Sequence, residues 1–165
     1  MGKTIKRTLY MKMLKYCETG IVFQEFPDEI TLAINISNCP HRCVGCHSPH
    51  LQTDCGEALD EKSIEKLVEP VKDLITCIGL MGGDASVEEL VSLAKHIRKR
   101  YPSLNIGWYS GNYAFPEEDI ASEFDYIKIG PYIECLGPLD SPTTNQKLYK
   151  KTFYGWEEIR MYDKL

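Results

Sequence analysis

The chain has 165 residues and a formal net charge of −5, with 43% hydrophobic and 26% charged residues. These values are typical of one soluble globular domain, so we expect a single domain over residues 1–165 that buries a core of its own. A protein that grips nucleic acid needs basic surface to neutralise phosphates, so the negative charge argues against nucleic acid as a partner.

The N-terminal segment, which we treat as an extension over residues 1–20, is basic but has no continuous apolar core of signal-peptide length. No stretch of the chain approaches the roughly 20 apolar residues that cross a bilayer. We therefore expect a cytoplasmic protein with no membrane partner. In that compartment, clustered cysteines are expected to bind metal rather than to form disulfides.

The first predicted elements form a hairpin. Residues 21–26 and 30–36 have strand character, and residues 27–29 contain the proline and acidic residues of a turn. In the second strand, large apolar residues alternate with small and polar ones such as Ala33 and Asn35. We predict that the large residues face a covering layer and that the small ones line a tighter or wetter face.

Helix and strand patterns alternate over the rest of the chain. They predict helices over 60–69, from Val87 onward and over 116–124, and strands over 75–81, 104–109 and 126–129. Asp60 is predicted to cap the first helix, and Ser86 with Glu89 to form a capping box for the second. This α/β alternation implies right-handed βαβ units and a mostly parallel sheet. Because a complete eight-fold barrel takes about 250 residues, we expect an incomplete (β/α) barrel.

Three loops follow predicted strands: a cysteine-rich loop, Gly82-Gly83-Asp84 and Ser110-Gly111. In folds of this kind the chemistry lies on loops at the carboxyl ends of the strands, so we expect the three to meet at one rim. Taken alone, the second loop is also typical of a turn before a helix, and the third of a simple turn.

The cysteine-rich loop holds Cys39, Cys43 and Cys46, whose soft thiolates suit zinc or an iron–sulfur centre. A structural zinc site closes with four ligands, and Cys55 or a histidine of the loop is the candidate for the fourth. A four-iron cluster held by three cysteines instead leaves one iron open, as catalytic metal sites do for their substrates. We favour the open cluster.

The other cysteines stand apart from this loop. Cys77 lies in an apolar run and is expected to be a small core residue. Cys17, Cys55 and Cys135 are isolated, so we expect each to be structural or incidental, apart from the possible ligand role of Cys55.

The spacing Cys39-x-x-x-Cys43-x-x-Cys46 after a strand resembles the signature of radical S-adenosylmethionine (SAM) enzymes. That resemblance implies a full or partial (β/α) barrel and a [4Fe–4S] cluster held by the three cysteines, which act as metal ligands and as catalytic residues. It also implies that the amino and carboxylate groups of SAM chelate the fourth iron. Reductive cleavage of SAM then gives methionine and a 5′-deoxyadenosyl radical.

Further motifs narrow the resemblance to the activating proteins of anaerobic ribonucleoside-triphosphate reductases. Gly45 before the last cysteine is typical of that group, and Gly82-Gly83-Asp84 is similar to the motif that meets the SAM amino group. Residues 108–111, 130–131 and 144–146 are also similar to family motifs, so the likeness runs from about residue 30 to residue 146. The chain departs from the family pattern at Ala85 and Ile129, where Pro and Asp are common.

The candidate cofactor-binding residues that the resemblance implies are Gly45, His47, Gly82, Gly83, Asp84, Ser110 and Asn35. For Asn35, a structural hydrogen bond is an equal alternative to a SAM contact. His47 is expected to orient the loop or to contact SAM, and His41 and His50 are expected to face solvent.

The activity that the resemblance implies is abstraction of a glycine α-hydrogen from the reductase, with a low-potential electron donor as a second partner. Two alternatives keep the cluster: an activase of another glycyl-radical enzyme, and a radical SAM enzyme with a small substrate. A non-catalytic zinc or iron–sulfur interaction module is the third. The aromatic tail, residues 147–165, is expected to cover the open side of the barrel or to anchor a partner.

Overall fold

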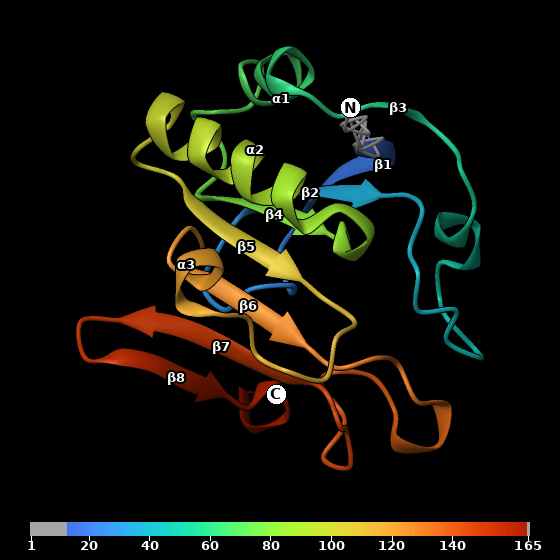
Figure 1. Cartoon of the computed structure of the whole chain (residues 1–165). Helices are drawn as coiled ribbons and strands as arrows, with labels where there is room; N and C mark the ends of the chain where they lie inside the picture. Colours follow the sequence, from blue (N-terminus) through green and yellow to red (C-terminus); the bar gives the residue numbers. More distant parts are fainter. Residues whose placement is uncertain (1–12, 165) are drawn as a thin grey trace, which may run out of the picture.

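The computed structural model describes residues 13–164, which form a single eight-stranded sheet with helices against one face (Figure 1). The strands lie in the order β3-β1-β2-β4-β5-β6-β7-β8. Their bounds are β1 Lys15–Val22, β2 Thr31–Ile36, β3 Glu57–Ala58, β4 Cys77–Met81, β5 Asn105–Tyr109, β6 Tyr126–Ile129, β7 Lys147–Thr152 and β8 Gly155–Ile159. The helices are α1 Glu61–Val68, α2 Val87–Arg100 and α3 Glu118–Ala121.

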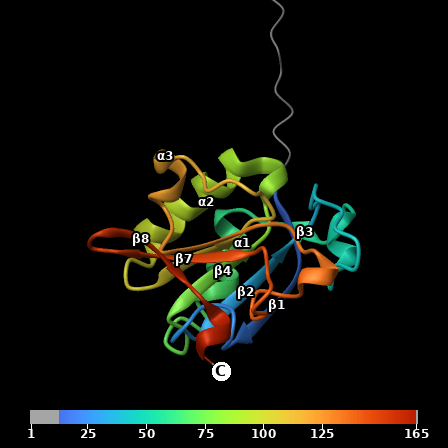
Figure 2. The ribbon, with the colours of Figure 1, turned by 90° about the horizontal axis from the view of Figure 1, so that it is seen from below.

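The sheet is mixed rather than mostly parallel. Strands β2, β4, β5 and β6 pair in parallel, as the alternating pattern predicted. Antiparallel pairs then extend this centre on both sides, β1 and β3 at one edge and β7 and β8 at the other. Figure 2 shows β3 and β8 at opposite ends of the sheet. The prediction of a mostly parallel sheet is therefore wrong at both edges, and the assignment to an incomplete barrel stays a prediction.

A hairpin is present, but the prediction of its first strand over 21–26 is wrong for residues 23–26, which belong to the connection. β1 starts at Lys15, inside the segment treated as an extension, and ends at Val22. Residues 1–12 of that extension lie outside the described part of the chain. The connection after β1 carries Phe26, which is fully buried, under the sheet face opposite the helices.

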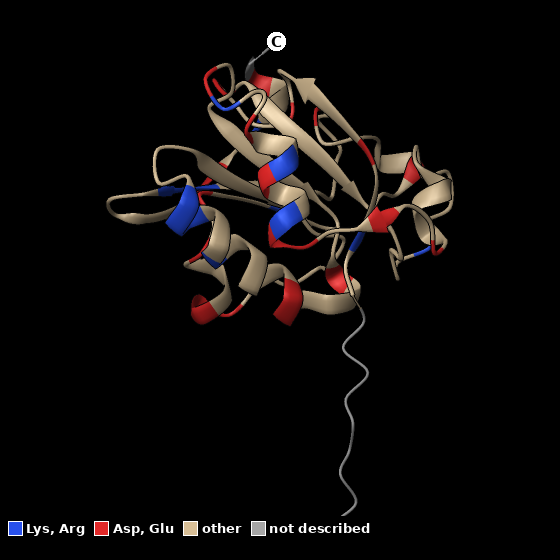
Figure 3. Cartoon of the chain, turned by 90° about the horizontal axis from the view of Figure 1, so that it is seen from above, with Lys and Arg blue, Asp and Glu red and all other residues tan. Residues whose placement is uncertain are grey.

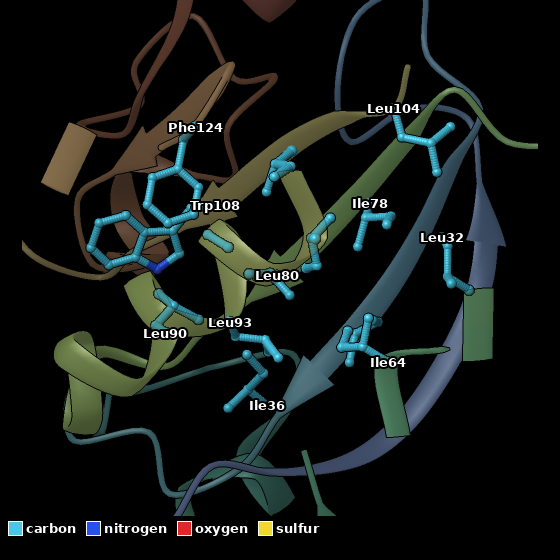
Figure 4. Close-up of a cluster of buried hydrophobic side chains, with 14 of the residues drawn as sticks. Leu32, Ile36, Ile64, Ile78, Leu80, Leu90, Leu93, Leu104, Trp108 and Phe124 are labelled. Atoms are coloured by element: carbon cyan, nitrogen blue, oxygen red, sulfur yellow. The ribbon is translucent and has the colours of Figure 1, made fainter. Parts of the chain in front are cut away.

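The helices cover one face of the sheet because each strand sends its large apolar residues to that side. Figure 4 shows this core, in which leucine and isoleucine side chains from β2 and β4 meet those of α1 and α2. Asp60 caps α1 as predicted, accepting from the Ser63 backbone N–H at 2.8 Å. The predicted capping box of α2 is wrong, because Asp84–Ser86 winds into a 3₁₀ turn and the Ser86 side chain makes no capping bond.

Acidic and basic residues are interspersed along the ribbon in Figure 3. The last turn of α2 is basic. Arg98 lies 2.7 Å from the carboxylate of Asp125, and Arg100 lies 2.8 Å from that of Glu69. No helix within residues 13–164 has both the length and the apolar character that crossing a membrane requires.

The aromatic tail extends the sheet. β7 pairs with β6, and the hairpin places Tyr149 and Trp156 edge-on against Phe115, with ring centroids 5.0 and 5.2 Å apart. At the tip of the hairpin, Phe153 and Tyr154 are 95% and 91% exposed. The first pair of aromatic residues therefore packs against the main core and the second does not, and the expected roles in covering a barrel or anchoring a partner stay predictions.

The face opposite the helices carries small residues of the three central strands β2, β4 and β5, as predicted for β2. A Cβ atom added to Gly107 would overlap the ring of Phe26, and one added to Gly79 would lie 3.1 Å from it. These two glycines in β5 and β4 therefore leave the space that the buried ring fills.

Gly107→Ala should lower the free energy of unfolding by about 1–3 kcal/mol, the usual cost of overpacking a close-packed core. Gly20→Ala is the matched control, because a Cβ atom at this exposed position of β1 meets nothing within 4 Å. Denaturant unfolding of both variants measures the difference. Equal stability of the two would contradict the packing described for Phe26.

Candidate functional site

A cavity of about 960 Å³ lies where the parallel strands end. The loops after β2, β4, β5 and β6 all contribute to its wall. Parallel neighbours place their carboxyl ends at the same edge of a sheet, so loops far apart in sequence become neighbours here. The predicted meeting of the cysteine-rich loop, residues 82–84 and residues 110–111 at one rim is therefore confirmed.

Cys39, Cys43 and Cys46 all line this cavity as free, half-buried thiols. The backbone N–H of Ser48 donates to Cys46 Sγ at 3.4 Å. Burial raises the pKa of the Cys39 thiol, and the charges of Asp84 and the other two thiols raise it further. A positively charged iron centre would offset both effects, because ligation removes the proton of each thiol.

The three thiols fit an iron–sulfur cluster by the chemistry of the donor set. Within residues 13–164, no three His, Cys, Asp or Glu side chains are grouped so as to hold one metal ion. A four-iron cluster is a larger body whose ligands are cysteine thiolates. Three soft thiols around one cavity supply such ligands.

Asp84 joins the three loops that form the rim. Its carboxylate, which is only 4% exposed, lies in the loop three residues after the end of β4. Oδ1 accepts from Ser110 Oγ at 2.7 Å and from Asn112 Nδ2 at 3.4 Å. Oδ2 accepts from the Gly111 N–H at 2.8 Å and contacts His41 Nε2 at 2.7 Å. A carboxylate offers about four acceptor positions, so this one is fully engaged by protein donors.

His41 is part of the site, and the prediction that it faces solvent is wrong. Its side chain is 20% exposed and extends from the cysteine-rich loop to Asp84. The ring also packs against Gly111, where an added Cβ atom would lie 2.8 Å from the imidazole Cγ. His50, by contrast, is 46% exposed and lies 3.4 Å from Glu18.

The structure brings together some of the predicted cofactor-binding residues. Those that line the cavity are Asn35, His47, Gly82, Asp84 and Ser110. The centroid of the His47 ring lies 4.9 Å from that of Tyr132. Ser110 is buried and donates its hydroxyl hydrogen to Asp84. Their predicted contacts with SAM stay predictions.

Gly45 and Gly83 are not among the residues of the cavity wall. Both have positive φ, +74° and +98°, which glycine adopts without strain. A Cβ atom at Gly45 would lie 3.1 Å from the Glu134 carboxyl carbon, and one at Gly83 would lie 2.8 Å from Leu90. Their role in this structure is therefore to shape the two loops, and a direct contact with a cofactor has no support from the cavity.

Lys128 is a site residue that the sequence analysis missed. It lies on β6, lines the cavity and is 8% exposed, and its Nζ donates to the carbonyls of Gly130 at 2.7 Å and Ser110 at 3.4 Å. Burial lowers the pKa of Lys128 to about 8, although Asp84 and the three thiols act in the opposite direction. The alternation of residues 126–129 could have revealed it, because it places Lys128 on the other face of β6 from Ile127 and Ile129.

Cys55 does not join the thiols of the cavity. It forms a disulfide with Cys17. The two cysteines are isolated in sequence but bonded in space, which agrees with a structural role, and the sulfur considered as a fourth ligand is bonded elsewhere. Cys77 is fully buried, as predicted for a core residue, and Cys135 is exposed.

His41→Ala should loosen the cysteine-rich loop, because the buried Asp84 carboxylate loses one of its partners. We expect the free energy of opening of the loop to fall by about 1–3 kcal/mol. Hydrogen exchange over residues 38–47 of the cluster-free chain measures this. His50→Ala, which removes an exposed histidine from the neighbouring turn, is the control. Equal exchange in the two variants would argue against the His41–Asp84 link.

Lys128 should make stability depend on pH. Its pKa in the folded chain lies below the ordinary value of 10.5, so the charged form disfavours folding at pH 7. This penalty, about 3 kcal/mol at most, is relieved as the pH rises from about 8 to about 10.5. Denaturant unfolding of the cluster-free wild type and of Lys128→Met should therefore be measured at pH 7 and at pH 10. The free energy of unfolding of the wild type should rise relative to that of the variant between the two pH values. A constant difference would contradict the lowered pKa.

A family model for a 4Fe-4S single cluster domain matches residues 30–136. No curated protein and no solved structure matches the chain. The matched segment begins just before β2 and ends after β6, so it contains the three cavity thiols, Asp84 and Lys128, and it covers more than half of the 165 residues. The chain therefore belongs to the 4Fe-4S single cluster domain family and is an iron–sulfur protein.

Proposed function

We propose that the chain is a radical SAM activase that installs a glycyl radical on an anaerobic ribonucleoside-triphosphate reductase. The observation that carries the proposal is the number of thiols at the cavity. Of the seven cysteines, only Cys39, Cys43 and Cys46 line it, and Cys55 is bonded to Cys17. Three ligands on a four-iron cluster leave one iron for a substrate or cofactor.

The size and lining of the cavity suit a small cofactor beside a cluster. Its volume of about 960 Å³ lies near the upper end of the range of about 300–1,000 Å³ for small-molecule sites. Asn35 and the buried amine of Lys128 supply polar groups, and the backbone beside Gly82 allows close approach. SAM carries an amino group, a carboxylate and a sulfonium, so a buried cation together with polar acceptors matches its methionine end.

When both are bound, the cluster and SAM supply a 5′-deoxyadenosyl radical. The residues of this chain position the partners and exclude water. Phe26, Met81, Tyr109, Leu139 and Met161 give the wall a largely apolar part, which shields a reactive species from solvent. Lys128 holds positive charge at the wall of the same cavity.

A protein substrate is favoured over a small one by the surface beside the rim. Val44 of the cysteine-rich loop is 82% exposed, and Tyr113, just after β5, is 74% exposed. These apolar side chains lie on two loops joined through Asp84, and a partner that inserts a glycine loop can cover them. An external low-potential electron donor completes the proposal.

The test combines the anaerobically reconstituted chain, SAM, a strong reductant and the anaerobic reductase of the same organism, followed by EPR. We expect a glycyl doublet on the reductase that is lost with Cys43→Ala and kept with Cys135→Ala, the control that removes an exposed thiol away from the cavity.

Two results would contradict the proposal. SAM cleavage without a doublet on the reductase would mean a different partner or a small substrate. Stoichiometric zinc, with no iron–sulfur absorption after reconstitution, would mean an interaction module. The first result would leave the cluster assignment intact, and the second would remove it.

A further inference from the structure

A second sulfur site lies beside the cavity. Cys17 of β1 and Cys55 form a disulfide, with Cα atoms 6.1 Å apart and 38 positions apart in sequence. The bridged segment contains β2 and all three thiols of the cavity. Both bridged residues are half-buried, and neither lines the cavity. The pair is therefore separate from the cluster ligands and partly open to solvent.

The backbone itself brings the two cysteines close, independently of the bond between their sulfur atoms. The register of β1 shifts between Tyr16 and Glu18, so Cys17 lies at an irregularity in the strand. Gly56 has φ +86°, and a Cβ atom there would overlap the carbonyl group of Tyr16. Residues 57–58 then pair with β1 as β3. This close approach keeps the two sulfur atoms facing each other when the bond is reduced.

The segment that carries Cys55 also positions the first ligand of the cavity. The backbone N–H of Cys39 donates to the Leu51 carbonyl at 2.9 Å, and that of Asn38 donates to the Thr53 carbonyl at 3.1 Å. Ser37 Oγ donates to the Cys55 carbonyl at 2.7 Å. Residues 37–39 therefore follow the position of residues 51–55, which the disulfide ties to β1.

The other five cysteines of the chain are free thiols, including the exposed Cys135. Free thiols of this kind, and ligands for iron, persist in a reducing compartment, where an accessible disulfide exchanges with the thiol pool. A bond that is half-buried at the edge of the sheet is open to such exchange. In its reduced state, Cys55 Sγ has an acceptor in the His50 carbonyl, 3.6 Å away.

We propose that Cys17 and Cys55 form a redox-active dithiol–disulfide pair whose state controls how firmly the cysteine-rich loop is held. Its co-reactant is a thiol reductant, either a dithiol protein or a low-molecular-weight thiol. A reductant thiolate attacks one sulfur, the S–S bond breaks, and the released thiolate takes a proton. A second reductant thiol then resolves the mixed disulfide. In total the pair gains two electrons and two protons, and the reductant becomes a disulfide. This inference does not rest on the proposed activase activity.

The first test uses the cluster-loaded chain under anaerobic conditions, equilibrated at a series of ratios of reduced to oxidised glutathione. Rapid alkylation and peptide mass mapping then report each cysteine. We expect Cys17 and Cys55 to become alkylated together, over one two-electron transition, while the exposed thiol of Cys135 forms at most a glutathione adduct at the oxidising ratios. Two results would overturn the proposal: a bond that survives the most reducing ratio in the native chain, and a bond that never forms at the most oxidising one.

The second test measures the link to the loop. Hydrogen exchange over residues 37–47 and 49–56 should be several-fold faster in the reduced wild-type chain than in the oxidised one. Cys17→Ser and Cys55→Ser should reproduce the fast exchange, and Cys135→Ser should not. Equal exchange in the oxidised and reduced wild-type chains would overturn the control of the loop without depending on how any variant folds.

Discussion

The hydrogen bonds of the buried Asp84 carboxylate hold together the loops that form the site. The carboxylate lies in the loop after β4 and binds donors from the cysteine-rich loop, through His41, and from the loop after β5, through Ser110 and Gly111. A buried charge is stable only when its hydrogen-bonding positions are filled. Each loop is therefore held in place by the same group, and the wall of the cavity forms as one unit.

This arrangement limits what Asp84 can do for a ligand. Four protein donors already fill its acceptor positions, so an ammonium group would have to displace or share one of them. Lys128 lies on the same cavity wall, where its charge offsets those of the carboxylate and the thiols. Five carboxylates line the cavity with this one lysine, so its wall carries more negative than positive charge: Glu18, Glu25, Asp28, Asp84 and Asp140.

Local pattern was enough to predict the parallel centre of the sheet. The bounds of β6, the cap at Asp60 and the meeting of the strand-end loops all follow from periodicity and from the direction of parallel strands. The local sequence pattern could not predict contacts between segments that are distant in the chain. The His41–Asp84 contact spans 43 positions and the Cys17–Cys55 bond spans 38, and both depend on which strands become neighbours. The antiparallel strands β1 and β7, next to the two edge strands, are largely exposed or half-buried, so their apolar signal is weak.

The proposed function requires that the three thiols hold a four-iron cluster with one iron open to SAM. Mössbauer spectroscopy of the chain reconstituted with ⁵⁷Fe, recorded with and without SAM, tests it most directly, because each iron reports its own ligands. We expect one of the four iron sites to change its Mössbauer parameters when SAM is added and the other three to keep theirs. Identical spectra in both conditions would contradict this expectation.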